Sequence, residues 1–229
     1  MLTFFFNGSP NPTKVALLLE EAELPYEPIP VDTRRGEQFS PKFLAVNPNG
    51  KVPAIVDGDV TVFDSNAILL YLAEKTGRFL PASPSERGPF LSWLMFVATG
   101  IGPFSGQAVH FRHFAPEPVP YADQRYQYEA RRHFGILDAR LAERRFVLGD
   151  AYTVLDMSVW GWSRMVPFIL GDDASWASLP HLKRHHDEIS ARPAAARAVA
   201  LKDRFAFKPA MDDEARAHMF KHLAPASAA

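Results

Sequence analysis

The 229-residue sequence contains no cysteine. Structural disulfides, cysteine-ligated zinc sites and catalysis by a thiol of the chain itself are therefore excluded. No run of eighteen apolar residues occurs either, so we expect no membrane-spanning helix. The apolar start of the chain, residues 1–6, has no basic flank, and turn residues follow it at once. We therefore expect no signal peptide and a cytoplasmic protein.

A large excess of charge of one sign is also missing. The sequence has 25 Lys and Arg residues against 26 Asp and Glu, which gives a formal net charge of −1 at pH 7. Without a basic excess, we expect neither nucleic acid nor a membrane surface as a partner. Hydrophobic residues make up 47% and charged residues 22%, as in ordinary globular proteins. The length allows one large domain or two small ones.

Strand and helix patterns alternate over the first eighty residues. Short apolar or alternating runs predict strands at residues 2–6, 26–31, 51–57 and 60–63. Helix formers follow Asn11 and Ser65, which we expect to be the N-caps of two helices. The order βαβ–ββα predicts a small mixed sheet with helices on its faces.

The pattern changes after Pro81, where a short linker leads into segments with helical periodicity only. They lie at residues 87–100, 122–145, 153–168 and 179–192, and glycine and proline, as at Gly102-Pro103, separate them. This part of the chain is predicted to be a helical bundle that ends near residue 207. One more exposed helix is expected at residues 211–223.

The Val52-Pro53 dipeptide interrupts the third expected strand. Proline removes a ladder donor, so this position must be an edge or a special bend. It is either a plain edge proline or a cis bond, and a cis bond would turn the backbone N–H and C=O of Val52 outward to pair with an extended peptide.

The Asp64-Ser65 pair stands where the second helix begins. Ser65 reads as a helix cap, which contributes about 1 kcal/mol. The alternative is a ligand site, because a helix N-terminus suits a carboxylate and Asp64 could pair with an ammonium group. Together the two residues could hold both charges of an α-amino acid.

Ser9 and Asn11 lie between the first strand and the first helix. A turn with Asn11 as the cap explains them structurally. In a functional role, the hydroxyl and the amide would face a ligand sulfur. One or two such hydrogen bonds together with the helix dipole could lower a thiol pKa by about 2 units from its free value of ~8.5.

The order of these motifs, with NPNGKVPA at residues 47–54 and DSNAILLYL at residues 64–72, resembles the glutathione transferase superfamily. The helical half carries GQAVHF at residues 106–111 and RYQYEARR at residues 125–132, and it is similar to the bacterial Nu class. It is also similar to that class's fungal relatives, the nitrogen-catabolite regulators. Thr153-x-x-Asp156 matches a capping box on a core helix of the superfamily.

The resemblance implies a role for each matched position. Ser9 and Asn11 would face the glutathione sulfur, and Gln38 would bind the glycine end. Val52, before Pro53, would pair with the cysteinyl backbone. Asp64 and Ser65 would bind the γ-glutamyl group. Arg132 would reach glutathione from the helical domain or across a dimer. Ser9 replaces the class's usual Thr and Asp64 its more common Glu, so altered affinity is expected.

The resemblance also implies an organisation and a reaction. We expect a thioredoxin-like βαβ–ββα glutathione-binding domain over residues 1–81, an all-helical second-substrate domain over residues 88–207 and a C-terminal extension over residues 208–229. The implied protein is a homodimeric enzyme without a metal that uses bound glutathione to reduce small disulfides. Conjugation or thiolytic cleavage of an electrophile is an alternative, and so is a non-catalytic glutathione-binding regulator.

Other motifs have structural explanations. His110-x-x-His113 has metal-pair spacing but no obvious acidic ligand. His185-His186-Asp187 is expected on a solvated helix face. Five aromatic residues are expected mostly in the core, with some members lining a pocket for the second substrate: Trp93, Phe96, Phe104, Phe111 and Phe114.

Overall fold

The structure is a computed structural model that describes residues 1–221. The chain forms two compact units. One, the sheet unit, comprises Met1–Ile68 together with the chain from Arg197 onward, and the other, the helical unit, comprises Leu69–Ala196. The domain boundaries expected at residues 81, 88 and 207 stay a prediction. The end of the expected C-terminal extension, residues 222–229, lies outside the described residues.

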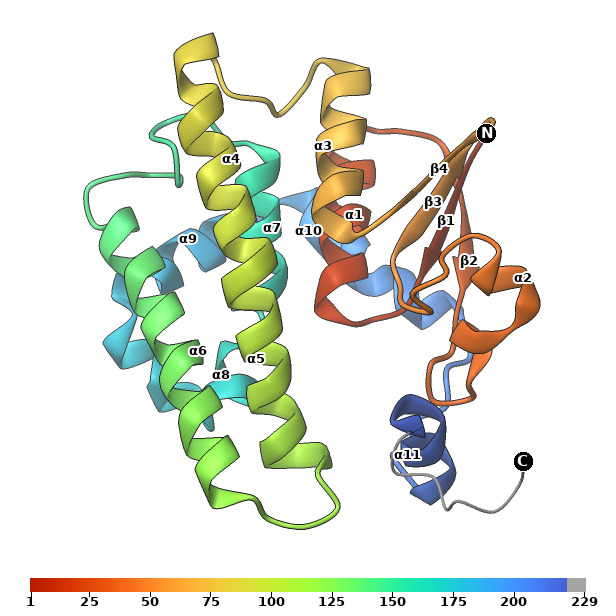
Figure 1. The fold of residues 1–229 in the computed structure, drawn as a ribbon. Coiled ribbons are helices and arrows are strands. Elements are labelled where there is room, and N and C mark those ends of the chain that lie inside the picture. The colour runs from red at the N-terminus through yellow and green to blue at the C-terminus, as the bar shows by residue number, and fades with distance from the viewer. Residues whose placement is uncertain (222–229) are drawn as a thin grey trace. The chain divides into compact units, whose positions relative to one another are not determined.

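The sheet unit is built on a four-stranded mixed sheet in the order β2-β1-β3-β4 (Figure 1). β1 (Leu2–Phe6) runs parallel to β2 (Tyr26–Pro30) and antiparallel to β3 (Ala54–Asp57). β3 in turn pairs antiparallel with β4 (Val60–Phe63). This is the expected thioredoxin-like arrangement.

Alternation along β1 gives the sheet two apolar faces. Phe5 packs with Val31, Ala54 and Phe43, and Phe43 comes from the short helix α2 (Pro41–Leu44). Phe4 and Phe6 point to the opposite face, where Phe6 contacts Phe205 edge to face. Both faces are therefore covered within this unit.

Two helices that begin in the sheet unit have N-cap residues different from those expected. α1 (Pro10–Glu21) has Ser9 as its N-cap, so Asn11 lies inside the first turn. Pro10 explains the shift, because its fixed φ and missing N–H suit the first helical position. α3 (Ser65–Thr76) is capped by Asp64, whose Oδ1 accepts from the backbone N–H groups of Asn66 and Ala67. Ser65 is the first helical residue instead of the cap.

The Val52–Pro53 peptide bond is cis, and β3 begins only at Ala54. The expected strand was therefore three residues too long at its start.

The helical unit runs without a break in helical structure from Arg87 to Phe114. α4 (Arg87–Phe96) continues through a π-helical segment (Val97–Ile101) into α5 (Gly102–Val109) and a second π-helical segment (His110–Phe114). The expectation that Gly102-Pro103 separates two helices was wrong. A wider π turn directly before the proline absorbs the missing N–H without ending the helix.

Further helices complete the helical unit. Before α4, a 3-10 turn (Pro84–Glu86) with a Ser83–Glu86 capping box occupies the expected linker. The others after Phe114 are α6 (Pro120–Leu141), α7 (Val154–Ser163), α8 (Val166–Leu170), the 3-10 segment Asp173–Ser178, α9 (Pro180–Ser190) and α10 (Pro193–Ala200). No helix among residues 1–221 has the length and apolarity needed to cross a membrane.

A buried polar network joins three segments of the helical unit. The predicted capping box of Thr153 and Asp156 is present. Asp156 also accepts hydrogen bonds from the backbone N–H of Val147, at 2.9 Å, and from Nε2 of His185, at 3.1 Å. Asp156 and His185 are fully buried, so a solvated face at His185 was a wrong expectation.

Two other expectations for this unit need correction. His186 is half-buried and its ring contacts Ser163, and this burial lowers its pKa to about 4. The five aromatic residues expected mostly in the core are all only half-buried: Trp93, Phe96, Phe104, Phe111 and Phe114.

Candidate functional site

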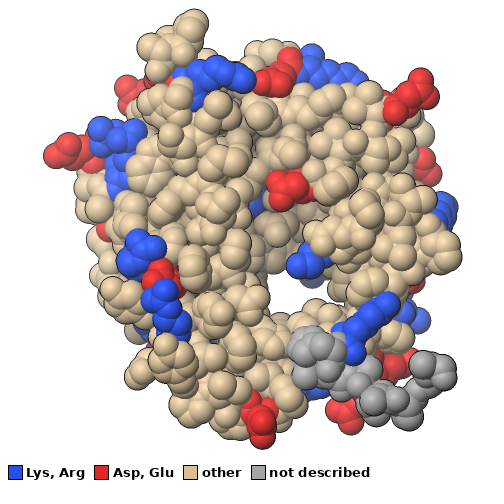
Figure 2. Space-filling view, viewed as in Figure 1, with Lys and Arg blue, Asp and Glu red and all other residues tan. Residues whose placement is uncertain are grey.

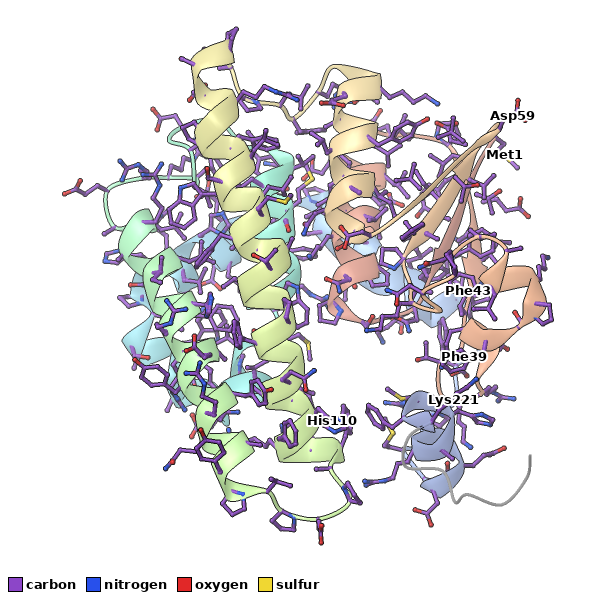
Figure 3. The ribbon with its side chains drawn as sticks, viewed as in Figure 1. Met1, Phe39, Phe43, Asp59, His110 and Lys221 are labelled. Carbon is purple, nitrogen blue, oxygen red and sulfur yellow. The ribbon has the colours of Figure 1, made fainter. Side chains whose placement is uncertain are left out.

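Strand register places four chain segments at one end of the sheet. Phe6 pairs with Pro30, Phe5 with Ala54, and Ala54 with Phe63. The chain therefore leaves β1, β2 and β4 and enters β3 at the same end. Met1 and Asp59, labelled in Figure 3, mark the opposite end. All predicted site residues except Arg132 belong to these four segments.

The segment after β1 forms a tight turn into α1. Oδ1 of Asn7 accepts from the backbone N–H of Ser9 at 3.0 Å, and the Ser9 carbonyl accepts from Thr13 Oγ1 at 2.8 Å. Ser9 is exposed and Asn11 half-buried. Because Asn11 does not cap the helix, its amide is not committed to the backbone of the first turn.

The segment after β2 is covered by the C-terminal part of the chain. Asp32 accepts from the backbone N–H of Lys208 at 2.6 Å, and Arg34 donates to the Pro209 carbonyl at 2.6 Å. The ammonium of Lys221 lies 3.6 Å from the ring centre of Phe39, and Figure 3 shows the pair beside α11 (Asp213–Met219). The expected exposed helix at residues 211–223 is thus shorter and half-buried.

Gln38 lies beneath this cover. It is buried, and its Nε2 donates to the carbonyls of Thr33 and His218 at 3.3 Å each. Its Oε1 has no hydrogen-bond partner among residues 1–221. Gln38 therefore carries a buried polar atom that a ligand or water can satisfy.

The segment before β3 is stiffened by its own side chains. Asn47 accepts from the backbone N–H of Asn49 at 3.0 Å and donates to the Lys51 carbonyl at 2.5 Å. Gly50 has φ 64°, and a Cβ there would approach Phe39 to 3.1 Å. Val52 follows half-buried, and Pro53 is buried.

Asp64 and Ser65 stand where β4 ends and α3 begins. Asp64 is exposed and has φ 72°, a left-handed conformation that Asp tolerates better than most residues. Its Oδ1 caps α3 through the N–H groups of Asn66 and Ala67, at 2.9 and 3.2 Å. Two of the helix's orphan N–H groups are therefore already satisfied, and Oδ2 is left for another partner.

Lys14 is a candidate site residue that the sequence interpretation missed. Its side chain is buried on α1, and its Nζ donates to Ser65 Oγ at 3.2 Å. Burial lowers the Lys14 pKa to about 7, while the Asp64 carboxylate acts in the opposite direction. The available signal was a lysine on the same helical face as Leu17 and Leu18, at spacings of three and four residues.

Arg132 lies on α6 of the helical unit and is partly exposed. Its Nε donates to Glu129 Oε2 at 2.9 Å, and one terminal nitrogen is 3.3 Å from His133 Nε2. Hydrogen bonds from Arg132 and the nearby charge of Arg125 hold the pKa of the Glu129 carboxyl below its usual range. The guanidinium keeps further donors for a partner.

Charge is mixed on the face shown in Figure 2, where Lys and Arg alternate with Asp and Glu. Within residues 1–221 no group of three or more His, Cys, Asp or Glu residues is arranged to hold a metal ion. His113 instead bonds to the Phe168 carbonyl at 3.0 Å and stacks on the Phe168 ring.

Comparison with known proteins identifies the family. The family model "Glutathione S-transferase, N-terminal domain" matches residues 2–74, and the corresponding C-terminal domain model matches residues 116–197. The chain belongs to the glutathione S-transferase family.

Three relatives illustrate the similarity. The chain is 42% identical over 206 residues to the disulfide-bond oxidoreductase YfcG of Escherichia coli, covering 87% of this chain and 94% of YfcG. It is 40% identical over 165 residues to protein URE2 of Meyerozyma guilliermondii, covering 68% and 53% of the two chains. A glutathione transferase from Burkholderia graminis, solved with two glutathione molecules per subunit, has a TM-score of 0.83 at 34% identity and 89% coverage of both chains.

The capping role of Asp64 gives a stability prediction. Asp64→Ala removes the α3 cap and places alanine at positive φ, so the free energy of unfolding should fall by about 1 kcal/mol or more. Asp64→Asn keeps a capping oxygen and tolerates this φ, so its stability should stay near wild type. Urea unfolding of both variants checks this, and equal stability of all three proteins would contradict the capping role.

Proposed function

We propose that this enzyme uses the thiol of bound glutathione to reduce small organic or glutathionyl disulfides. The observation that carries the proposal is the pair formed by the exposed Asp64 carboxylate and the adjoining Ser65 hydroxyl at the N-terminus of α3. One supplies an anion and the other a donor at a helix end, which matches the ammonium and carboxylate of the γ-glutamyl group.

The γ-glutamyl group is assigned to this pair. Oδ2 of Asp64 takes the ammonium, because Oδ1 is engaged in capping α3. The α-carboxylate takes the Ser65 hydroxyl and the remaining free N–H of the first helical turn. The backbone of Val52, next to Pro53, pairs with the cysteinyl residue as an added strand.

The glycine end of glutathione is assigned to Gln38. Nε2 of Gln38 is shared between two carbonyl groups, so binding a carboxylate there requires it to release the carbonyl of His218. Arg132 supplies a further donor from the helical unit or from a second copy of the chain.

Ser9 and Asn11 are assigned to the sulfur. Hydrogen bonds from the hydroxyl and the amide, together with the N-terminal end of α1, favour the thiolate over the thiol. Removing a proton from sulfur at neutral pH is the activation that this chemistry needs, because the thiolate is the nucleophile.

The reaction then runs through two glutathiones. The thiolate of bound glutathione attacks one sulfur of the substrate disulfide, forming a mixed disulfide and releasing the other sulfur as a thiolate that takes up a proton. A second glutathione thiolate attacks the glutathione sulfur of the mixed disulfide, which gives oxidised glutathione and the second substrate thiol. A chain without cysteine has no resolving thiol of its own, so the second glutathione is required. The two glutathiones in the Burkholderia graminis relative support this stoichiometry.

Two alternatives use the same binding site. In conjugation or thiolytic cleavage, the thiolate attacks an electrophilic carbon instead of sulfur. In a glutathione-binding regulator, as the resemblance to fungal nitrogen-catabolite regulators suggests, binding persists without turnover. The name of the relative YfcG favours disulfide reduction over both. We place the enzyme in the cytoplasm, where the glutathione pool is kept reduced.

The enzyme is proposed to be a homodimer. Tyr121, Tyr128 and Ile136 are exposed apolar residues spaced by seven and eight positions on α6, so they lie along one side of that helix. An apolar stripe of this kind is suited to a second subunit.

Sedimentation tests the assembly. A dimer is expected at micromolar concentration, and Tyr128→Asp should shift it toward monomer, because burying a carboxylate in an apolar contact is unfavourable. A monomeric wild-type chain would remove the homodimer and any role for Arg132 across its interface.

Turnover separates the proposed reaction from its alternatives. With glutathione as reductant, a small organic disulfide should be reduced faster than an aryl halide is conjugated, as followed by formation of oxidised glutathione and of thioether. Asp64→Asn should lower kcat/KM for the disulfide at least about tenfold, because a charge-assisted hydrogen bond is lost while α3 stays capped. Conjugation alone would support the first alternative, and binding without either reaction would support the second.

The pKa of the thiol of bound glutathione tests the proposed roles of Ser9 and Asn11 directly. Asn11→Asp places an anion beside the sulfur, so the thiol pKa should rise toward its free value of ~8.5. Ultraviolet thiolate absorbance across a pH series measures it. Ser9→Ala should raise the pKa less, because it removes one neutral donor without adding a negative charge. If neither variant changes the thiol pKa while both bind glutathione, this turn does not activate sulfur.

A further inference from the structure

A buried cation adjoins the start of α3 in the sheet unit. Lys14 is only 1% exposed and sits in the apolar part of α1, between the buried residues Thr13 and Val15. Burying an ammonium group is unfavourable unless a partner compensates. Among the described residues, the one charged group whose field acts appreciably on Lys14 is Asp64. The side chain ends on Ser65, the first residue of α3.

The hydrogen bond from Lys14 determines whether the Ser65 hydroxyl acts toward a ligand as a donor or as an acceptor. A hydroxyl has one proton to donate and two lone pairs to accept with. When the Lys14 ammonium donates to Ser65 Oγ, it occupies a lone pair, and the hydroxyl proton must point to another acceptor. Ser65 is 4% exposed, so few directions remain open to that proton. The ammonium therefore fixes Ser65 as a donor.

We propose that Lys14 is a positioning residue that orients the Ser65 hydroxyl toward the α-carboxylate of the γ-glutamyl group and supplies the positive charge behind it. The proposal rests on the proposed function for the identity of the ligand. Lys14 does not touch glutathione in this role and acts through Ser65.

Protonation of Lys14 then controls the direction of the hydrogen bond. A neutral amine at Lys14 can accept the Ser65 proton, which turns the hydroxyl away from the ligand. Because burial holds the Lys14 pKa at about 7, both forms exist near neutral pH in the free protein. A bound carboxylate favours the ammonium form and raises this pKa, so ligand binding above neutral pH takes up a proton.

Calorimetry with S-methylglutathione measures this linkage. The methyl group removes the thiol, so no sulfur proton enters the balance. The ligand's α-amino group, which binds as an ammonium, also takes up protons at alkaline pH, but its share is common to wild type and to a Lys14 variant that keeps Asp64. Titrations at about pH 8.5 in two buffers of different ionisation enthalpy give the number of protons taken up. At that pH most Lys14 side chains of the free protein are neutral, and Lys14 is expected to contribute uptake of most of one proton beyond that of the ligand's amine. At about pH 5.5 Lys14 is already charged and the uptake from this group should vanish.

Lys14→Met keeps the length and apolar packing of the stem but removes the charge. It should bind S-methylglutathione about 10- to 100-fold more weakly at neutral pH, and at about pH 8.5 it should take up fewer protons than wild type by the share that Lys14 contributes. Lys42→Met, on the exposed surface of α2, is the matched control and should change neither quantity. Unfolding midpoints should not fall in Lys14→Met, because the cost of burying an ammonium is removed.

Ser65→Ala provides the second test. If Lys14 acts through this hydroxyl, the affinity loss of Lys14→Met should largely disappear in a Ser65→Ala background. Additive losses would mean that Lys14 acts by another route. The single Ser65→Ala variant should also take up less proton at about pH 8.5, which keeps the proposal testable should Lys14→Met not fold.

The possible failures can be told apart. Wild-type protein that does not bind S-methylglutathione contradicts the proposed function itself. Equal proton uptake in wild type and Lys14→Met, or equal affinity of the two proteins, contradicts only the role of Lys14. A parallel loss of stability and affinity in Lys14→Met would make the residue structural and overturn the positioning role.

Discussion

The pairing of β3 determines where the candidate residues of the sheet unit lie. β3 runs antiparallel to both β1 and β4, and β1 runs parallel to β2. With this register the turn before α1, the segment around Gln38, the Val52–Pro53 bond and the cap of α3 meet at one end of the sheet. A slip of one residue in β3 would turn Ala54 away from the cluster of Phe5 and Phe43. Packing of the sheet thus also fixes the end at which the candidate site residues lie.

The start of α3 combines a structural requirement and a proposed binding role in two adjacent residues. Asp64 adopts a left-handed conformation, and one of its carboxylate oxygens caps the helix. Ser65 is buried and receives a hydrogen bond from a lysine that is itself buried. A left-handed aspartate and a buried ammonium both reduce stability. Such features persist where the surrounding structure enforces them, and they concentrate at functional sites.

Local sequence patterns predicted the sheet and its helices well. Leu2–Phe6 and Val60–Phe63 form strands at the predicted residues, because alternation and turn residues are local signals. Thr153 and Asp156 form the predicted capping box for the same reason. The predictions were wrong where a helix boundary depended on adjacent residues. Pro10 moved the α1 cap from Asn11 to Ser9, and a π-helical turn allowed the helix to continue through Pro103.

The candidate site was less accessible to sequence reasoning. Asp64, Ser65 and Val52-Pro53 stand out as motifs, whereas their convergence depends on strand order. Lys14 lies fifty-one positions from Ser65, so no local pattern reveals their hydrogen bond. The C-terminal cover over Gln38 likewise joins segments 180 positions apart. His185 looked solvated because its buried partner, Asp156, is on another helix.

A crystal structure with glutathione bound tests the central claim most directly. The account predicts that the γ-glutamyl ammonium contacts the Asp64 carboxylate and that the α-carboxylate accepts from the Ser65 hydroxyl, with Val52 paired to the cysteinyl backbone. Well-ordered glutathione whose glutamyl group contacts neither Asp64 nor Ser65 would contradict it.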